Sequence, residues 1–407
     1  MKKIILLMLA ILLVSKISYA TSSKDNKVFL VWERIPNAVM YELIIKKKYY
    51  KDVFLTQETK ITYVPGTELE YYGENLYYQV RALDVNKLPM TKFSSEIPID
   101  SNNTKTKIVT LGDYDNVPNS KLYQVFTWVP VNNANYYVLR VAKLQNDQYS
   151  LVREYKISGK AVFDYYDKKP YIDTGKYVWS VVAYDQNEKM ITESSSQSFT
   201  VDRNETVIAS LGDSITHGGG AISNPPSYPE YNWQSYTNYK IRNLGYSGNT
   251  VDDLVNRFNN DVLPFRPKTL IILAGINDLR QGRDSNYVIK GLNLLKNKCI
   301  INNIKPIFVS VTPLNPEKMI KVLGSRPDAY WRQEQDKVNS WIQQQEYNIN
   351  VHDMMINNEG LLKEDLSVDG LHPDIEGKKI IGTIINEYID KMYEFKIAVE
   401  TLLKEDK

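Results

Sequence analysis

Hydrophobic and polar residues alternate in many short runs before about residue 203. Two examples are Tyr-Glu-Leu-Ile-Ile at 41–45 and Tyr-Val-Leu-Arg-Val at 137–141. A period of two residues predicts a strand with one buried face. Asn, Asp, Gly and Pro, which favour turns, separate the runs. Regularly spaced short strands without helical patterns predict all-β sandwiches in this part of the chain.

The same region contains an internal repeat. The pattern Tyr-x-Val-x-Ala at 78–82 returns as Trp-x-Val-x-Ala at 179–183. Six earlier positions recur at identical spacing: Trp32, Asn37, Ala38, Tyr41, Leu43 and Ile45 correspond to Trp128, Asn133, Ala134, Tyr137, Leu139 and Val141. Two units of about 90 residues fit this repeat best, and we place them at 21–102 and 103–203. The early tryptophan and the later strand resemble bacterial fibronectin type III-like modules.

Around residue 204 the pattern changes from alternation to continuous apolar runs separated by helical periodicity. The apolar runs are 207–211, 269–274 and 306–311, and the helical patterns are 287–304, 331–345 and 374–392. Apolar strands that alternate with helices predict a parallel sheet covered on both faces. We therefore expect an α/β domain at 204–395. The charged residues at 396–407 predict a frayed C-terminal tail.

The N-terminus has the three-part pattern of a secretory signal peptide. Lys2 and Lys3 precede an unbroken apolar run at 4–14, and Ser18-Tyr19-Ala20 supplies small residues where a signal peptidase reads. The apolar run is shorter than the ~20 residues of a membrane span. The alternatives are an uncleaved anchor or a buried helix. We expect a signal peptide at 1–20, no membrane insertion after cleavage, and a protein that is secreted, periplasmic or on the cell surface.

Charge and cysteine content exclude several kinds of partner. The formal net charge is +2, and removal of residues 1–20 takes away three lysines and no acid, which leaves −1. This balance gives no electrostatic reason to bind nucleic acid or an anionic membrane. The chain has three histidines and one cysteine, Cys299, so no intrachain disulfide can form and a zinc cluster is not expected. Cys299 lies in a helical pattern, where it is expected to be a core residue.

Three short polar motifs stand beside the predicted elements of the α/β domain. Gly-Asp-Ser-Ile-Thr at 212–216 follows the first apolar strand, and Gly-Ile-Asn-Asp at 275–278 follows the second. Asp-Gly-Leu-His-Pro at 369–373 comes just before the last helix. Ligands of open parallel sheets bind beyond the carboxyl ends of the strands. The three motifs are therefore expected to meet in one cleft.

Together the motifs supply the parts that acyl transfer needs, which are a nucleophile, a base, a group that orients the base, and donors for an oxyanion. Ser214 is the candidate nucleophile and His372 the candidate base. Asp369, three residues earlier, can accept a hydrogen bond from the other imidazole nitrogen. Asn277 offers a side-chain amide to the oxyanion, and Gly248, in Ser-Gly-Asn at 247–249, offers a backbone N–H.

The order Gly-Asp-Ser-Ile-Thr, Ser-Gly-Asn, Gly-x-Asn-Asp and Asp-x-x-His resembles the SGNH hydrolases, also called the GDSL family. The resemblance covers about 207–393. It implies a flavodoxin-like three-layer fold, no cofactor, no metal, and hydrolysis of carboxylic esters or thioesters. It also implies a catalytic triad of Ser214, Asp369 and His372, and an oxyanion hole formed by Ser214, Gly248 and Asn277. Any one block alone is a common turn or loop, but all four occur here in family order.

Four further polar residues near the motifs have more modest expected roles. His217 is expected to line the pocket or cap the following segment, since a triad needs only one base. His352 is expected to be structural. Asp213 and Asp278 are expected to hold loops by accepting backbone N–H bonds. The aromatic residues of 218–236 and 314–331 either contact sugar rings or pack the loops, and we favour sugar contact.

These observations favour a secreted serine esterase that removes acyl groups, most simply acetyl, from a polysaccharide or cell-wall glycan. A lipase, arylesterase or thioesterase is the alternative within the same enzyme class. A glycan-binding or adhesion protein with a vestigial hydrolase domain is the alternative from another class. Because every proposed catalytic residue lies at or after Ser214, a chain that begins near Arg203 is expected to keep its activity on a small ester.

Overall fold

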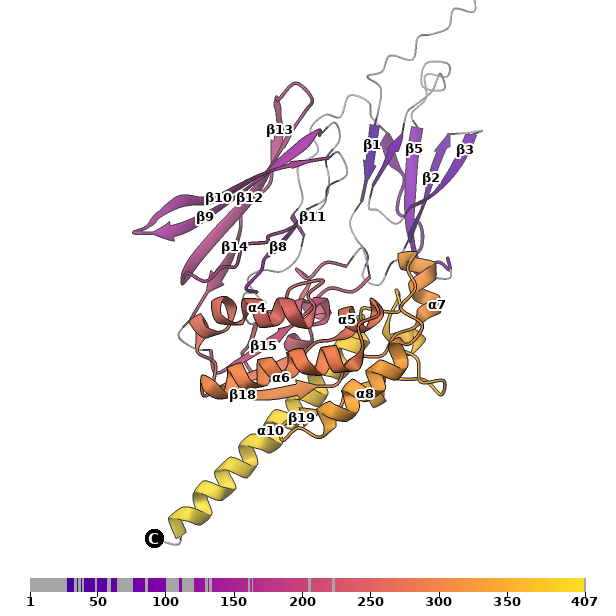
Figure 1. Cartoon of the computed structure of the whole chain (residues 1–407). Helices are drawn as coiled ribbons and strands as arrows, with labels where there is room; N and C mark the ends of the chain where they lie inside the picture. Colours follow the sequence, from indigo (N-terminus) through magenta and orange to yellow (C-terminus); the bar gives the residue numbers. More distant parts are fainter. Residues whose placement is uncertain are drawn as a thin grey trace, which may run out of the picture.

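The structure is a computed structural model, drawn in Figure 1. It describes residues 28–32, 35, 38, 40–47, 50–56, 60–63, 76–84, 87–99, 110–111, 121–128, 131, 134–159, 162, 164–203, 206–221 and 224–405. Only the backbone is described for 28–29, 31, 47, 50–52, 60–63, 110–111 and 393–405. The predicted signal peptide lies outside these residues. Among the described residues, the structure has no helix with the length and apolar character needed to span a membrane.

A five-stranded parallel sheet forms the centre of the C-terminal domain, as the apolar runs predict. Its spatial order is β16, β15, β17, β18 and β19. The strands are β15 (Ile208–Gly212), β16 (Ile241–Asn243), β17 (Thr269–Leu273), β18 (Lys305–Val309) and β19 (Asn348–Ile349). Counted along the chain, this is the 2-1-3-4-5 order of flavodoxin-like sheets, whose ligands bind beside the first strand, where the order reverses. β15, which precedes Ser214, is that strand.

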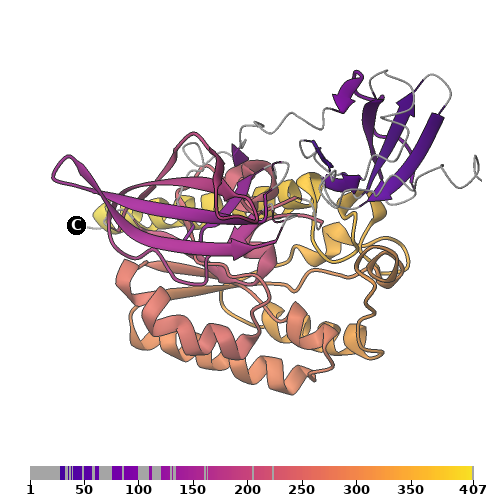
Figure 2. The same cartoon turned by 90° about the horizontal axis from the view of Figure 1, so that it is seen from above.

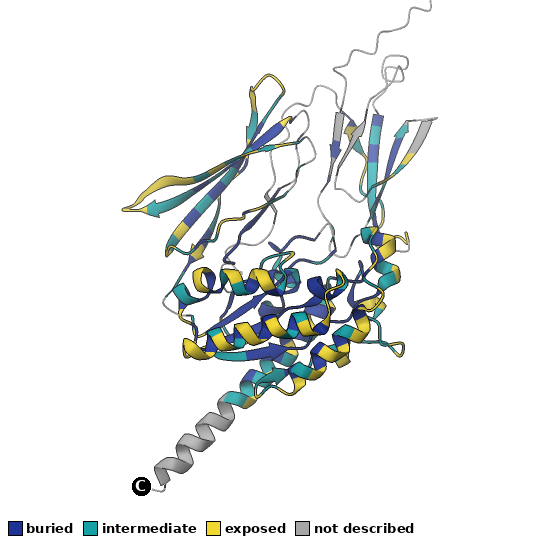
Figure 3. Ribbon diagram, in the orientation of Figure 1, coloured by how far each residue is buried: buried dark blue, intermediate teal, exposed yellow. Residues whose placement is uncertain are grey.

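Helices cover both faces of this sheet (Figures 1 and 2). One layer consists of α4 (Val251–Asp261), α6 (Ser285–Ile301) and α8 (Trp331–Gln343). The other face is crossed by α10 (Ile375–Glu405). All residues of β15 and β17 are buried, because strands covered on both sides have no face left for water (Figure 3). The outer faces of the helices are exposed in the same view.

The last helix is longer than the sequence pattern predicts. We expected it to end near Met392 and residues 396–407 to fray, but α10 continues to Glu405. Residues 393–405 contain neither Gly nor Pro and are rich in good helix formers. Because this segment contains neither of the residues that stop a helix, Met392 did not mark the helix end.

The N-terminal half consists of antiparallel sheets, as the alternating pattern predicts. In the first unit, a four-stranded sheet has the order β3, β2, β5 and β6, and β1 pairs with β4. The strands are β1 (Val28–Val31), β2 (Met40–Lys47), β3 (Tyr50–Thr56), β4 (Lys60–Tyr63), β5 (Leu76–Leu83) and β6 (Ile97–Ile99). The repeated residues Trp32, Tyr41, Leu43 and Ile45 share one buried cluster. The repeat therefore marks core positions.

The second unit also consists of a larger and a smaller antiparallel sheet. The five-stranded sheet has the order β10, β9, β12 and β13, with β14 paired to β12, and the three-stranded sheet has the order β11, β8 and β7. The strands are β7 (Thr110–Leu111), β8 (Val125–Trp128), β9 (Tyr136–Gln145), β10 (Gln148–Ser158), β11 (Asp164–Tyr166), β12 (Gly175–Tyr184), β13 (Met190–Glu193) and β14 (Gln197–Val201). Trp128, Tyr137 and Trp179 are buried together. The fibronectin type III-like character of both units, and the domain boundaries, stay predictions.

Two residues of the second unit are buried in the hydrophobic core of the α/β domain. Leu122 and Tyr123 precede β8, yet both belong to the buried cluster of the α/β domain. The Leu122 N–H donates to the carbonyl of Asn243, the last residue of β16, at 3.0 Å. The hydroxyls of Thr127 in the second unit and Ser227 in the α/β domain form a hydrogen bond, with 3.0 Å between their oxygens. This contact gives a physical reason to reverse the expectation that a chain beginning near Arg203 keeps its activity.

Candidate active site

The turn after β15 presents Ser214 at the start of the single-turn helix α3 (Ser214–His217). Asp213 caps this helix, because its Oδ1 accepts the Ile215 N–H at 2.9 Å. A Cβ on Gly212 would stand 2.3 Å from the Leu273 carbonyl oxygen and 2.4 Å from Thr216 Oγ1. Only glycine therefore allows the turn to approach β17 this closely. Ser214 itself is half-buried.

His372 lies between Ser214 and Asp369. Its Nε2 is 3.1 Å from Ser214 Oγ, and its Nδ1 is 2.7 Å from Asp369 Oδ2. Asp369 is fully buried, and its Oδ1 accepts the N–H groups of Leu371 and His372 at 2.9 and 2.8 Å. These separations are within the hydrogen-bond reach that a nucleophile, a base and an orienting acid require. The structure thus brings together the three residues that the sequence singled out.

The environment keeps Asp369 ionised. Burial by itself would raise the pKa of this carboxyl, but the His372 ring and the two backbone N–H groups stabilise the charged form, and the pKa is lowered. A carboxylate accepts a hydrogen bond from Nδ1–H, so the free lone pair of the imidazole is on Nε2. That nitrogen is the one that points toward the serine hydroxyl.

Asn277 and Gly248 are held beside the same turn by backbone contacts. Asn277 Nδ2 donates to the Asn249 carbonyl at 2.9 Å, and Arg280 Nε donates to Asn277 Oδ1 at 2.9 Å. An amide nitrogen carries two hydrogens, so one is left for a second acceptor. Gly248 adopts φ +85°, and the Tyr246 N–H donates to the Gly212 carbonyl at 3.0 Å. The 246–249 turn is thereby joined to the nucleophile turn.

Asp213 and Asp278 hold loops, as we expected. Besides the contact of Asp213 with Ile215, Asp278 Oδ2 accepts the Val251 N–H at 3.0 Å at the start of α4. Burial raises the pKa of Asp213 to about 6 and that of Asp278 to about 7. His352 begins α9 (His352–Met355), where its N–H donates to Ser310 Oγ at 3.0 Å. This contact is structural, as predicted.

His217 has a role that the sequence did not suggest. The ring is 1% exposed, so it neither lines an open pocket nor caps a helix. Its Nδ1 is 2.9 Å from Ser247 Oγ, and its Nε2 is 2.8 Å from the Tyr123 carbonyl oxygen. Both nitrogens therefore have partners inside the protein. No sequence signal links His217 to Tyr123, because 94 residues separate them.

Lys378 is a second residue that the sequence analysis missed. It is fully buried in α10, and its Nζ donates to the Ile215 carbonyl at 2.8 Å, behind the nucleophile turn. Burial lowers the pKa of Lys378 to about 7. A signal was present, since Lys378 falls on the same helical stripe as the buried Ile381, Ile385 and Ile389. A lysine on the core stripe of a helix needs a buried acceptor.

The aromatic residues of the loops pack inward, contrary to our expectation of sugar contact. Tyr231 and Trp233 are fully buried, and Trp331 is 6% exposed. Short 3-10 turns, η1 (Pro229–Tyr231) and η2 (Trp233–Tyr236), direct the first two side chains toward the core, and η2 packs against α10. Apolar aromatic area is stabilised more by this burial than by exposure on a loop. Tyr330, at 64% exposed, is an exception.

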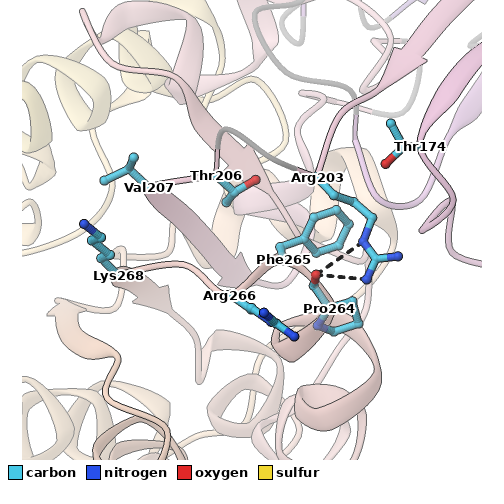
Figure 4. Close-up of a pocket in the computed structure, with 8 residues that line it drawn as sticks. All are labelled: Thr174, Arg203, Thr206, Val207, Pro264, Phe265, Arg266 and Lys268. Carbon is cyan, nitrogen blue, oxygen red and sulfur yellow. Dashed lines mark hydrogen bonds between the residues drawn. The ribbon is translucent and has the colours of Figure 1, made fainter.

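A separate cavity of about 600 Å³ lies at the opposite end of β15, next to Val207 (Figure 4). Arg203 lines this cavity and donates to the Pro264 carbonyl through Nε and Nη2 at 3.3 and 3.1 Å. Its wall consists of Thr174, Arg203, Thr206, Val207, Pro264, Phe265, Arg266 and Lys268. None of the proposed catalytic residues lines it. In the described part of the chain, no group of three or more His, Cys, Asp or Glu is arranged to hold a metal ion.

Comparison with known proteins identifies the α/β domain. Residues 210–380 match the model of the GDSL-like Lipase/Acylhydrolase family. The match includes Ser214, Gly248, Asn277, Asp369 and His372. This part of the chain is therefore a GDSL-like acylhydrolase domain, and the protein is a serine ester hydrolase.

Similar solved structures also cover the C-terminal part of the chain. A putative acylhydrolase from Bacteroides fragilis is 20% identical, with a TM-score of 0.38, over 47% of this chain and 89% of its own. An acetyl-xylooligosaccharide esterase from Geobacillus is 21% identical, with a TM-score of 0.36, over 46% of this chain and 94% of its own. A lipase/acylhydrolase from Enterococcus faecalis is 19% identical, with a TM-score of 0.36, over 45% of this chain and 95% of its own. A search of curated proteins gives no match.

Proposed function

We propose that this protein is a secreted esterase that uses Ser214, His372 and Asp369 as a catalytic triad and forms an acyl-enzyme. The hydrogen-bonded series from Ser214 Oγ to His372 Nε2 and from Nδ1 to Asp369 carries the proposal, because each member has the partner its role needs. The proposed secretion rests on the pattern of residues 1–20.

In the first half of the reaction, Ser214 Oγ attacks the ester carbonyl carbon and its proton moves to His372 Nε2. Asp369 stabilises the resulting imidazolium without taking its proton. The carbonyl oxygen becomes an oxyanion, which accepts hydrogen bonds from the N–H groups of Ser214 and Gly248 and from the Asn277 amide. Collapse of this intermediate breaks the bond to the alcohol oxygen, and the alcohol leaves with the proton from Nε2.

In the second half, water attacks the acyl-enzyme carbonyl. Nε2 takes one proton from the water, and a second tetrahedral intermediate forms in the same oxyanion hole. Its collapse breaks the bond to Ser214 Oγ, which recovers its proton from His372. The free carboxylic acid is released, and the enzyme returns to its starting state.

For the substrate, we propose acetyl groups on a polysaccharide or cell-wall glycan. The export pattern and the two β units before the hydrolase domain support this choice. Because Tyr231 and Trp233 are fully buried, their rings cannot stack on a sugar, and any sugar contact must come from other residues. A lipase or thioesterase is the second candidate. The glycan-binding alternative is disfavoured by the hydrogen bonds that join Ser214, His372 and Asp369.

A hydrolysis panel tests the acyl preference. The enzyme should hydrolyse aryl acetates with higher kcat/KM than aryl octanoates, and it should release acetate from acetylated xylan or acetylated peptidoglycan. The assay compares initial rates across aryl esters from acetyl to long acyl and then measures acetate from the two polymers. Higher kcat/KM for long acyl chains, with no acetate from either polymer, would contradict the glycan assignment and favour the lipase or thioesterase.

Asn277→Ala should lower kcat by about 10²–10³-fold, the usual cost of one oxyanion donor. KM should change little, because the amide is expected to bind the oxyanion more strongly than the ground-state carbonyl. Steady-state kinetics on an aryl acetate measure both constants. An effect on KM alone would make Asn277 a ground-state contact instead.

A further inference from the structure

Tyr123 belongs by sequence to the second β unit but is buried in the α/β domain. It stands two residues before β8 and is 7% exposed. Its ring contacts that of Tyr246 edge-on, with centroids 4.6 Å apart. Its carbonyl and its hydroxyl each start a series of hydrogen bonds that runs to the 246–249 turn.

The first series starts at the carbonyl. The Tyr123 carbonyl oxygen can only accept, so His217 Nε2, at 2.8 Å, carries the hydrogen. Nδ1 then has a lone pair, which accepts the Ser247 hydroxyl at 2.9 Å. Burial, together with the charge of Lys121, lowers the pKa of His217 to about 3. The ring is therefore neutral near pH 7, and the direction of both hydrogen bonds is fixed.

The second series starts at the hydroxyl. Tyr123 Oη donates to Asp261 Oδ2 at 2.7 Å, and Arg257 Nη1 donates to the same oxygen at 2.9 Å. Arg257 also donates through Nε to Asn249 Oδ1 at 2.6 Å and through Nη2 to the Gly212 carbonyl at 3.1 Å. Both Asp261 and Tyr123 are buried, so these bonds are shielded from water.

The two series end on Ser247 and Asn249, the neighbours of Gly248. Gly248 is exposed, and a Cβ placed on it would have no atom within 4 Å. No packing on Gly248 therefore fixes the direction of its N–H, and its neighbours must do so. We propose that Tyr123 is a positioning residue that orients the Gly248 N–H for the oxyanion, which makes the second β unit part of the esterase site. This inference rests on the proposed function.

Tyr123→Phe is the first test, with Tyr171→Phe as the matched control. Tyr171 is also a buried tyrosine of the second unit, and its hydroxyl donates to Asp167 Oδ2 at 2.9 Å, an oxygen that it shares with Arg153 Nη1 at 2.8 Å. Each variant thus removes one hydroxyl from an equivalent Tyr-Asp-Arg group. Tyr123→Phe should lower kcat about tenfold, less than the complete loss of an oxyanion donor. KM should stay unchanged, and Tyr171→Phe should keep kcat.

Ser247→Ala and Ser247→Thr test the first series on a half-buried residue whose replacement leaves the core intact. Ser247→Ala should lower kcat to a similar degree, and Ser247→Thr, which keeps the hydroxyl, should restore it. Equal losses in Tyr123→Phe and Tyr171→Phe would overturn the inference in favour of general destabilisation. Wild-type kcat in both Tyr123→Phe and Ser247→Ala would overturn it outright.

Ser214→Ala in the same assay separates this inference from the proposed function. If Ser214→Ala is inactive while Tyr123→Phe and Ser247→Ala keep wild-type kcat, only the positioning role fails. If Ser214→Ala remains active, the proposed function fails instead.

Discussion

Ser214→Ala should lower kcat/KM for an aryl acetate by about 10⁴–10⁶-fold, and His372→Ala should have an effect of similar size. In the proposed mechanism the two side chains act as one unit, because Nε2 of His372 would take the proton of the Ser214 hydroxyl, which lies 3.1 Å away. The double variant should therefore be hardly worse than either single variant. Initial rates at high enzyme concentration measure the remaining activity.

The thermal unfolding midpoint supplies the control for both variants. Ser214 is half-buried and lies outside the hydrophobic cluster, so Ser214→Ala should unfold at a temperature close to that of the wild type. His372→Ala should fold but unfold at a lower temperature, because it takes the Nδ1 partner away from the buried carboxylate of Asp369. Near-normal turnover by a folded Ser214→Ala would contradict the assignment of the nucleophile. Independent losses that multiply in the double variant would contradict the shared role.

Removal of both β units should abolish hydrolysis even of a small aryl ester, whereas removal of the first unit alone should not. A chain that begins near Arg203 loses Leu122 and Tyr123 from the core of the α/β domain. It also leaves His217 Nε2 without its Tyr123 partner, at about 1–3 kcal/mol for an unsatisfied buried group, and leaves Arg257 as the remaining partner of Asp261 Oδ2. A chain that begins near residue 103 keeps all of these contacts.

The comparison needs kinetics and unfolding temperatures for the two shortened chains and the full chain on the same aryl acetate. Full activity in the chain that begins near Arg203 would show that the contacts of Leu122 and Tyr123 with the α/β domain are dispensable. Loss of activity in the chain that begins near residue 103 would show that the first unit also supports the site, for which the contacts described above give no reason.

The α/β part of the fold was predictable because its physical causes are local. Continuous apolar strands such as 207–211 and 269–274 are typical of parallel sheets that helices cover on both faces, and both became buried parallel strands. The end of α10 was misjudged because the charged residues after Met392 were taken as a tail, whereas a helix continues through charged residues when no Gly or Pro stops it. The positions repeated in the β units were core positions, which is why they recur.

The candidate site was predictable only as far as its motifs are contiguous in sequence. Asp369 and His372 stand three residues apart, and the Ser214 turn follows a recognisable strand. The packing of Tyr123 against His217 joins residues 94 positions apart, and no local pattern reports such a contact. The inward packing of Tyr231 and Trp233 depends equally on what the fold brings against the loop. Composition cannot distinguish an aromatic residue that packs a loop from one that binds a ligand.

Covalent labelling of the intact protein tests the central claim most directly. The wild-type chain is incubated with a fluorophosphonate, which phosphonylates an activated serine with loss of fluoride, and is then analysed by intact and peptide mass spectrometry. We predict one phosphonyl group per chain, on the peptide that contains Ser214, together with loss of ester hydrolysis. The label should be absent from Ser214→Ala and strongly slowed in His372→Ala. An unlabelled Ser214 in a hydrolytically active protein, or a label on another residue with equal loss of activity, would contradict the account.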